Sequence, residues 1–175
     1  AEYHGLMAEL CLKRDSLFPL KDYRDFKGDP LAGLMSVLSR CRPDEQVFIQ
    51  YVMRPQTDSG YLHFKLNLWK RLYSLRHIFR VKYWFKHDAG KQVKEALQRK
   101  SVERLYRASM RVAAISAESP ESPALRVDAV FGALANVNTL DFNQLVIRRV
   151  AEGVRHLAPF QERALSSPFL MSTKE

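Results

Sequence analysis

The sequence predicts an α+β domain, because segments with the pattern of strands alternate with segments with the pattern of helices along its 175 residues. Strands with one buried face carry apolar side chains at every second position. Helices carry them at i, i+3, i+4 and i+7. The hydrophobic fraction of 46% excludes a disordered tail, and the length allows one domain to bury a core without disulfides or metal.

The first half of the chain predicts a strand, a helix and a second strand. Residues 3–14 alternate in polarity, as in a strand with one buried face. Asp29 and Pro30 supply an N-cap and a first-turn proline for a helix that runs to about Arg40. Residues 46–54 are β-branched and aromatic on both faces, which indicates a strand packed on both sides or nearly so.

The second half predicts the same succession of elements. Residues 104–116 alternate in polarity and predict a strand. A helix over residues 122–135 begins at a Ser-Pro pair, and residues 142–149 predict a short fourth strand. The remainder, residues 151–175, contains two prolines and reads as an extended or loosely packed tail.

The resulting order is strand-helix-strand twice, interrupted by an insert at residues 61–102. Two split βαβ halves form the ferredoxin-like sheet, so we predict that fold with a long basic helical insertion between strands two and three. Residues 1–150 then make a single α+β domain. Inside the insert, residues 79–85 alternate like a strand, and the choice between helix and strand stays open there.

The basic charge of the chain is concentrated in residues 61–107. This window holds 13 Lys/Arg against 3 acids, a balance of +10, and the whole chain is +9, so the rest sums to −1. Such a surface favours nucleic acid, anionic lipid or an acidic protein face, unless it is merely solvated. The candidate nucleic-acid or partner contacts in it are Lys70, Arg71, Arg76, Arg80, Lys82 and Lys86.

The same window holds both tryptophans of the chain. Leu66, Trp69 and Tyr73 share one face of a predicted helix. A face of this kind usually packs in a core or against another helix, so these residues are a candidate packing or docking face. Exposed aromatic rings can instead stack on unpaired bases, and this second interpretation also stays open.

The sequence shows no constellation of catalytic residues. Its Gly90-Lys91 pair lacks the upstream glycine and the following Ser/Thr of a P-loop, whose backbone N–H groups must wrap a phosphate. The five histidines are scattered without metal-ligand spacing. We therefore predict no catalytic, metal or nucleotide-binding residue, no cofactor in this chain, and no enzymatic activity of the chain as it stands.

The cysteines and apolar runs bear on the compartment. Cys11 and Cys41 are too few and too far apart for a zinc site or a disulfide framework, which favours a reducing compartment. The apolar runs are too short to span a membrane, and the first residues contain no secretory signal. We expect a cytoplasmic location and no transmembrane segment.

Several segments resemble the region in front of the ATPase module in ATPases of bacterial conjugation and type IV secretion systems, the HerA/FtsK-like group. They are residues 29–39 (Asp-Pro-Leu and a helix), 44–55 (Glu-Gln, an apolar strand and Pro), 100–117, and 170–175, which looks like the entry into the ATPase module. Together they cover most of residues 29–175. The insert at 61–99 departs from the group because it is more basic and more aromatic.

The resemblance implies a longer parent chain, a hexameric motor at the inner face of the cell membrane. Residues 151–175 would lead toward a missing C-terminal ATPase domain that binds ATP and Mg. The chain would then be a non-catalytic N-terminal docking or assembly domain that serves DNA or protein transfer. Its partners would be other secretion or conjugation components, with DNA as a further candidate. The alternative is a free-standing nucleic-acid-binding module that uses residues 61–107.

Overall fold

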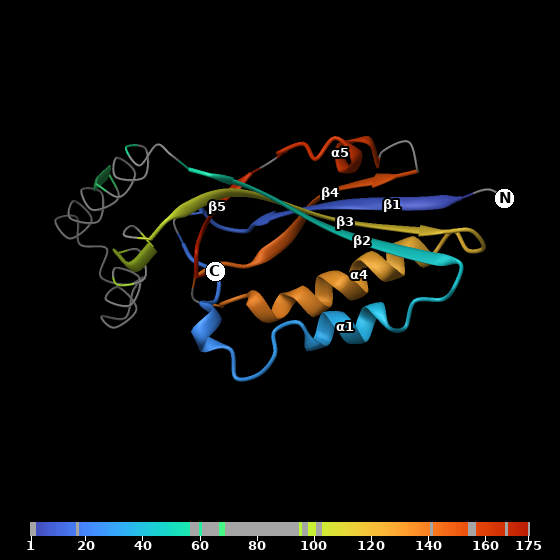
Figure 1. Ribbon diagram of the computed structural model, residues 1–175, viewed down its shortest axis with the longest axis horizontal. Helices are drawn as coiled ribbons and strands as arrows, with labels where there is room; N and C mark the ends of the chain where they lie inside the picture. The colour runs from blue at the N-terminus through green and yellow to red at the C-terminus, as the bar shows by residue number, and fades with distance from the viewer. Residues whose placement is uncertain are drawn as a thin grey trace, which may run out of the picture.

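The fold is a single antiparallel sheet with helices on both faces, seen in a computed structural model of the chain (Figure 1). The structure describes residues 3–16, 18–56, 103–140, 142–153, 157–166 and 168–174, with Gly60, Asn67, Leu68, Glu95 and 98–100 between them. The strands are β1 (His4–Leu12), β2 (Glu45–Pro55), β3 (Leu105–Ser116), β4 (Leu145–Glu152) and β5 (Phe169–Ser172). The helices are α1 (Ala32–Leu38), α4 (Ser122–Leu134) and α5 (Ala158–Gln161), with short 3₁₀ turns η1 (Tyr23–Asp25) and η2 (Ala135–Val137).

The strand order is β2-β3-β1-β4, and β5 adds to the free part of β3. Every pairing in it is antiparallel. β3 is the central strand, because it pairs with β2 along its length, with β1 at one end and with β5 at the other. The predicted α+β class is confirmed, and so are the four predicted strands and two predicted helices within a few residues of their bounds.

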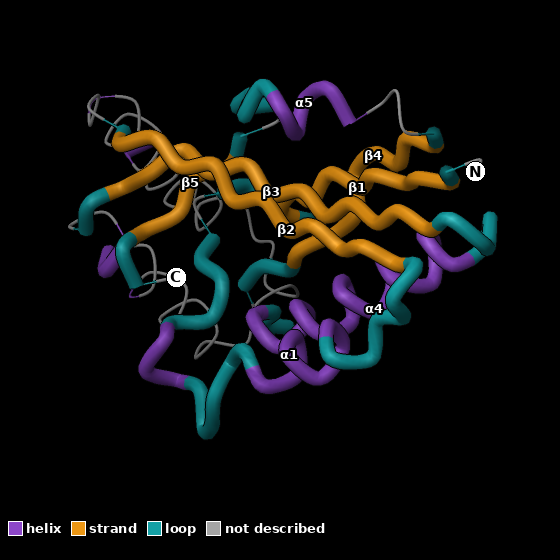
Figure 2. Tube along the Cα trace, turned by 45° about the vertical axis from the view of Figure 1, so that its right-hand side comes forward, coloured by secondary structure: helices purple, strands orange, loops and turns teal. Residues whose placement is uncertain are grey.

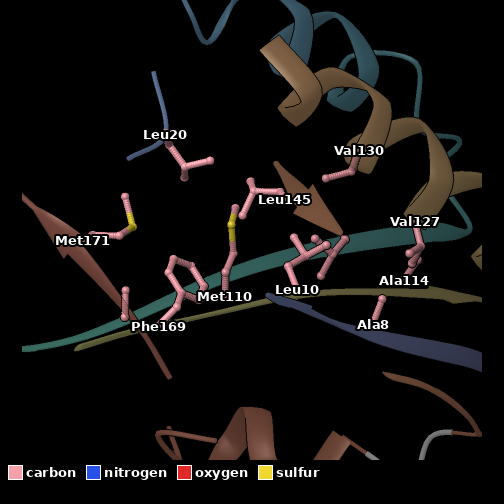
Figure 3. Packing of buried hydrophobic residues seen from close by; sticks show 12 residues of the cluster. Ala8, Leu10, Leu20, Met110, Ala114, Val127, Val130, Leu145, Phe169 and Met171 are labelled. Atoms are coloured by element: carbon pink, nitrogen blue, oxygen red, sulfur yellow. The ribbon is translucent and has the colours of Figure 1, made fainter. Parts of the chain in front are cut away.

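The core lies between the sheet and the layer of α1 and α4 (Figure 2). The alternation in β1 and β3 turns one row of each strand toward these helices, and α4 adds two valines three residues apart on its buried face. Figure 3 shows this packing, which includes Ala8 and Leu10 from β1, Met110 and Ala114 from β3, and Val127 and Val130 from α4.

The opposite face of the sheet is buried as well, which differs from the prediction of one buried face for the first strand. Glu9 of β1 and Arg111 of β3 point to that side and are almost completely buried. The chain after β4 crosses over this face, and α5 lies on it (Figure 1). The alternation of a strand shows that its two faces differ in polarity. It does not show whether a later segment of the chain covers the polar face.

The segment after residue 150 is more ordered than the sequence predicts. Of the two predicted forms, an extended or a loosely packed tail, residues 169–172 take the extended one, because they form β5, which pairs with Leu105–Ala108 of β3. Phe169 and Met171 of this strand belong to the core. Four residues after a proline are too few to show the period of a strand. β5 forms because these residues can pair with β3.

β2 is the edge strand of the sheet, and both of its faces are packed in part, which is less than the predicted packing on both sides or nearly so. Val47 and Ile49 do pack against the core. Phe48, Tyr51 and Met53, however, keep 42%, 41% and 45% of their surface exposed. The composition of β2 is that of a buried strand, but the strand lies at the end of the strand order, where the layers on the two faces of the sheet cover it less completely.

Candidate functional site

The sequence-predicted contact residues lie outside the part of the chain that the structure describes. This holds for Lys70, Arg71, Arg76, Arg80, Lys82 and Lys86, and for the packing face of Leu66, Trp69 and Tyr73. The alternation at residues 79–85 is outside it too. All of these assignments stay predictions. The candidate site described below consists of described residues near the point where β2 ends and β3 begins.

The segment that connects β2 to β3 contains most of the basic window, and its two ends join the sheet side by side. β2 ends at Pro55, β3 begins at Leu105, and Pro55 lies opposite Tyr106 in the register. The next pair in the register is Arg54 and Arg107, both exposed. Like charges directly opposite in a sheet repel each other, so this pair lowers stability and leaves two cations available to an anion.

An apolar cavity of about 450 Å³ opens at this same end of the sheet. Its lining comes from the core side of β2, β3 and β5, the start of β4, the end of α4 with η2, and the loop after β1. It consists of Leu20, Tyr51, Met53, Tyr106, Met110, Leu134, Val137, Leu145, Phe169, Met171, Ser172 and Thr173. Figure 3 shows several of these side chains, among them Met110, Phe169 and Met171, turned toward one another. The volume is in the range of about 300–1,000 Å³ that is usual for ligand pockets.

The cavity exists because the sheet continues past the helices. α4 ends at Leu134 and η2 follows it, whereas β2, β3 and β5 extend farther (Figure 1). Beyond that point the loop that carries Leu20, rather than α1 or α4, faces the core side of the sheet. Tyr51 and Met53, which would be core residues under a longer helix, form its rim instead, and the Tyr51 hydroxyl donates to the Met171 sulfur.

The chemistry of this lining is that of a docking surface. Methionine side chains are unbranched and polarizable, so Met53, Met110 and Met171 can adapt to the shape of an inserted apolar group. Tyr51 and Tyr106 offer large apolar bodies with a polar tip, a combination common at protein interfaces. The surface formed by the cavity and its rim is called the open end below.

A small polar pocket of about 100 Å³ adjoins the open end and shares Leu20 and Ser172 with it. Its cations and carboxylates largely pair with one another. Lys174 bonds Glu103 at 2.8 Å, and the side-chain hydrogen bond from Arg24 lowers the pKa of Asp22 against the opposing effect of burial. Beside this pocket the Tyr23 N–H donates to the Lys174 carbonyl at 2.9 Å, which joins the loop before α1 to the chain after β5.

The opposite end of the sheet is closed by a charged cluster around Glu45, at the start of β2. Arg126 of α4 lies 2.6 Å from its carboxylate, Arg42 bonds it from the preceding turn, and the Ser122 hydroxyl donates to it. Burial by itself would raise the pKa of Glu45. The hydrogen bonds from the Arg42 backbone, Ser122 and Arg126 outweigh that effect and lower the pKa to about 2. We call this the closed end.

A second buried charge fastens the chain across the outer face. Arg111 is fully buried, and its guanidinium donates to Glu9 at 3.2 Å and to the Gln50 amide oxygen at 2.9 Å. The same group reaches the Ser166 hydroxyl and the Ala164 carbonyl. These bonds satisfy the buried cation and hold the segment after α5 on the sheet. The row of β3 that carries Arg107, Ser109 and Arg111 has the polarity of an exposed face, so the sequence contained no signal for this contact.

Other classes of site find no support in the described residues. No group of three His, Cys, Asp or Glu side chains is placed there to hold a metal ion. Both cysteines are free thiols, and burial raises the pKa of the Cys11 thiol against the opposing charge of Arg148. In the described ranges, no helix has the length and apolarity needed to cross a membrane.

The open end and the covered outer face are features that sequence reasoning missed. The cavity arises from the different lengths of the helix layer and the sheet, which no local sequence pattern reveals.

Comparison with known proteins identifies a family for the chain. Neither the curated proteins nor the solved structures contain a match. A family model described as a domain of unknown function (DUF8128) matches residues 3–166, nearly the whole chain, and the chain belongs to this family.

Proposed function

We propose that this chain is a non-catalytic docking and assembly domain at the N-terminus of a conjugative or type IV secretion ATPase, which drives DNA or protein transfer. The observation that carries the docking role is the open end, an apolar cavity with a half-exposed rim of Tyr51 and Met53. Apolar surface of this kind marks interaction sites on soluble domains. The link to a transfer ATPase rests on the segments of the sequence that resemble such proteins.

The topology supports a ferredoxin-like arrangement. The order β2-β3-β1-β4 with a helix after β1 and after β3 is the order that two split βαβ halves produce. Between β2 and β3 we place the long basic insertion, whose two ends meet beside the open end. A docked partner would then contact the insertion and the cavity together.

The proposal extends to the whole parent chain. A C-terminal domain beyond Glu175 would bind ATP and Mg and form a homo-oligomer at the inner face of the cell membrane. The partners of the present domain would be other secretion or conjugation components. The first test is the length of the native polypeptide, by the open reading frame and the intact mass. A P-loop after Glu175 supports the proposal, and a native product that ends near residue 175 removes it.

The docking role has a separate test on the chain itself. Met53→Glu places a charge on the rim of the cavity, and Leu125→Glu places one on an equally apolar, exposed position of α4 far from the open end. Binding to purified transfer components, measured by surface plasmon resonance, should weaken at least tenfold for Met53→Glu and stay within twofold for Leu125→Glu. Equal effects of both variants would contradict docking at the open end.

A free-standing nucleic-acid-binding module is the second candidate. The exposed Arg54–Arg107 pair favours it, since two opposed cations at the root of the basic window suit two neighbouring phosphates. DNA affinity should then fall steeply with salt, and Arg54→Glu with Arg107→Glu should weaken it. Charge reversal at Lys70, Arg71, Arg76, Arg80 and Lys82 should abolish it, while Lys27→Glu, an exposed control, should leave it unchanged. An affinity that is weak and the same for all variants rejects this candidate.

A further inference from the structure

The outer edge of β2 is long and meets no other strand within the described part of the chain, although Phe160 of α5 contacts Phe48 and Gln50 on the outer face. Its eleven residues pair with β3 on one side and with no described strand on the other. Phe48 and Met53 are half exposed along it. Sheet edges in soluble proteins are normally blocked by lysines, bulges, short strands or a covering segment, because unpaired N–H and C=O groups accept any further strand. β2 contains no lysine, is regular in its register with β3, and has its exposed arginine, Arg54, and its one proline together at its C-terminal end.

The sequence of β2 is complementary to itself in one antiparallel register. If Gln50 lies opposite Gln50 of a second copy, every side chain from Gln46 to Arg54 faces one of matching polarity on the same side of the joined sheet. The pairs are Val47 with Met53, Ile49 with Tyr51, Phe48 with Val52, and Gln46 with Arg54. Cross-strand pairs of this kind are the units that stabilise a sheet.

Neighbouring registers lose this match. A register shifted by two residues places Phe48 opposite Gln50, or opposite Arg54, depending on the direction of the shift. A shift by one residue sets the core face of one copy against the outer face of the other. The centred register is therefore the one in which the apolar rows on both faces continue across the junction.

The helix layer offers a second contact on the same side. Figure 2 shows α1 and β2 on the near side of the molecule. Met35 of α1 is 61% exposed and Leu31, at the start of that helix, is 56% exposed. A two-fold axis perpendicular to the sheet at Gln50 keeps the helix layers of both copies on one side. The exposed apolar side chains of α1 would then approach those of the partner's helix.

We infer that two copies of this chain associate through β2, by antiparallel edge-to-edge pairing centred on Gln50, into one continuous sheet. The occupant of the edge is a second copy because the strand matches its own sequence. A foreign strand would not require the alternation of β2 to be symmetric about its middle. This inference concerns self-association and stands apart from the docking role of the open end.

The first test is register-specific cross-linking of the chain, after Cys11→Ser and Cys41→Ser remove the native thiols. The variant that combines Phe48→Cys and Val52→Cys should form a disulfide-linked dimer under mild oxidation, because each new thiol faces the other residue of the second copy. Within one copy the two positions are about 13 Å apart along the strand, too far for an internal disulfide. Phe48→Cys alone and Val52→Cys alone are the matched controls and should remain monomeric on non-reducing gels.

The second test measures association without new thiols. Sedimentation of the unmodified chain should show a dimer that dissociates on dilution. The variant that combines Phe48→Lys and Val52→Lys sets four cations at one junction and should raise the dissociation constant at least tenfold, with an unchanged far-UV circular dichroism spectrum. A chain that is monomeric at all concentrations overturns the inference. So does cross-linking of the single-cysteine controls as fast as the double variant, because the register would then be wrong.

Discussion

The two ends of the sheet are built from different interactions. At the closed end, Glu45 is held by two arginines and a hydroxyl, and its polar atoms are satisfied. At the open end, the cavity lining is mostly apolar, with a half-exposed rim of Tyr51 and Met53, and the nearby Arg54 and Arg107 repel each other. The closed end therefore contributes specific stability, whereas the open end retains apolar surface and two opposed cations that have no anionic partner among the described residues. Surface of that kind is expected where a domain meets a partner.

The largest effect is expected from a truncation beneath the cavity. Phe169→Ala removes a buried ring from β5 and enlarges the space at the open end, so the free energy of unfolding should fall by about 3 kcal/mol. Urea denaturation followed by circular dichroism gives this value. Leu140→Ala, at a position 85% exposed, is the control and should change it by less than about 0.5 kcal/mol. A loss below about 1 kcal/mol would mean that β5 contributes little to the core.

Breaking the closed end should have the next largest effect. Glu45→Ala leaves Ser122 without its acceptor and Arg126 without its carboxylate. Because the Arg126 side chain keeps partial access to water, we expect a loss of about 2 kcal/mol rather than the larger value of a fully buried pair. The same denaturation experiment measures it. A neutral result would show that the cluster orients β2 without stabilising it.

The pH dependence of stability sharpens the comparison at Glu45. Its pKa in the folded chain is about 2, below the ordinary value of 4.5, so its contribution is complete above pH 4.5 and is lost as the pH falls toward 2. Glu45→Gln lacks this group. The difference in unfolding free energy between the two chains should therefore shrink over that window. A difference that stays constant from pH 5 to pH 2.5 would contradict the lowered pKa.

The smallest predicted effect has the opposite sign and belongs to the open end. Arg54→Glu converts a repulsive cross-strand pair with Arg107 into an attractive one, which should stabilise the chain by about 0.5 kcal/mol. The gain should decrease at high salt, since both residues are exposed. Arg54→Gln, which only removes the repulsion, should give part of it. A destabilised Arg54→Glu chain would indicate that Arg54 has a partner in the sheet.

Local patterns were sufficient for the regular elements. The alternation in residues 3–14 and 104–116 predicted β1 and β3, and the Ser-Pro pair with the apolar spacing after it predicted α4. These elements follow from the sequence because period and capping act over a few residues. The basic window is also a property of the sequence alone, although its predicted contacts lie outside the described residues.

Tertiary structure decided what each face of the sheet meets. No local pattern states that Phe169 and Met171 pair against β3, that residues after α5 cover Glu9 and Arg111, or that β2 lies at the edge. Each of these depends on segments tens of residues apart that meet once the sheet is assembled. The cavity is still less visible in any local pattern, because it results from a sheet that is longer than the helices that cover it. The sequence by itself determined which segments are strands and helices, and the folded arrangement determined which of their surfaces are left for a partner.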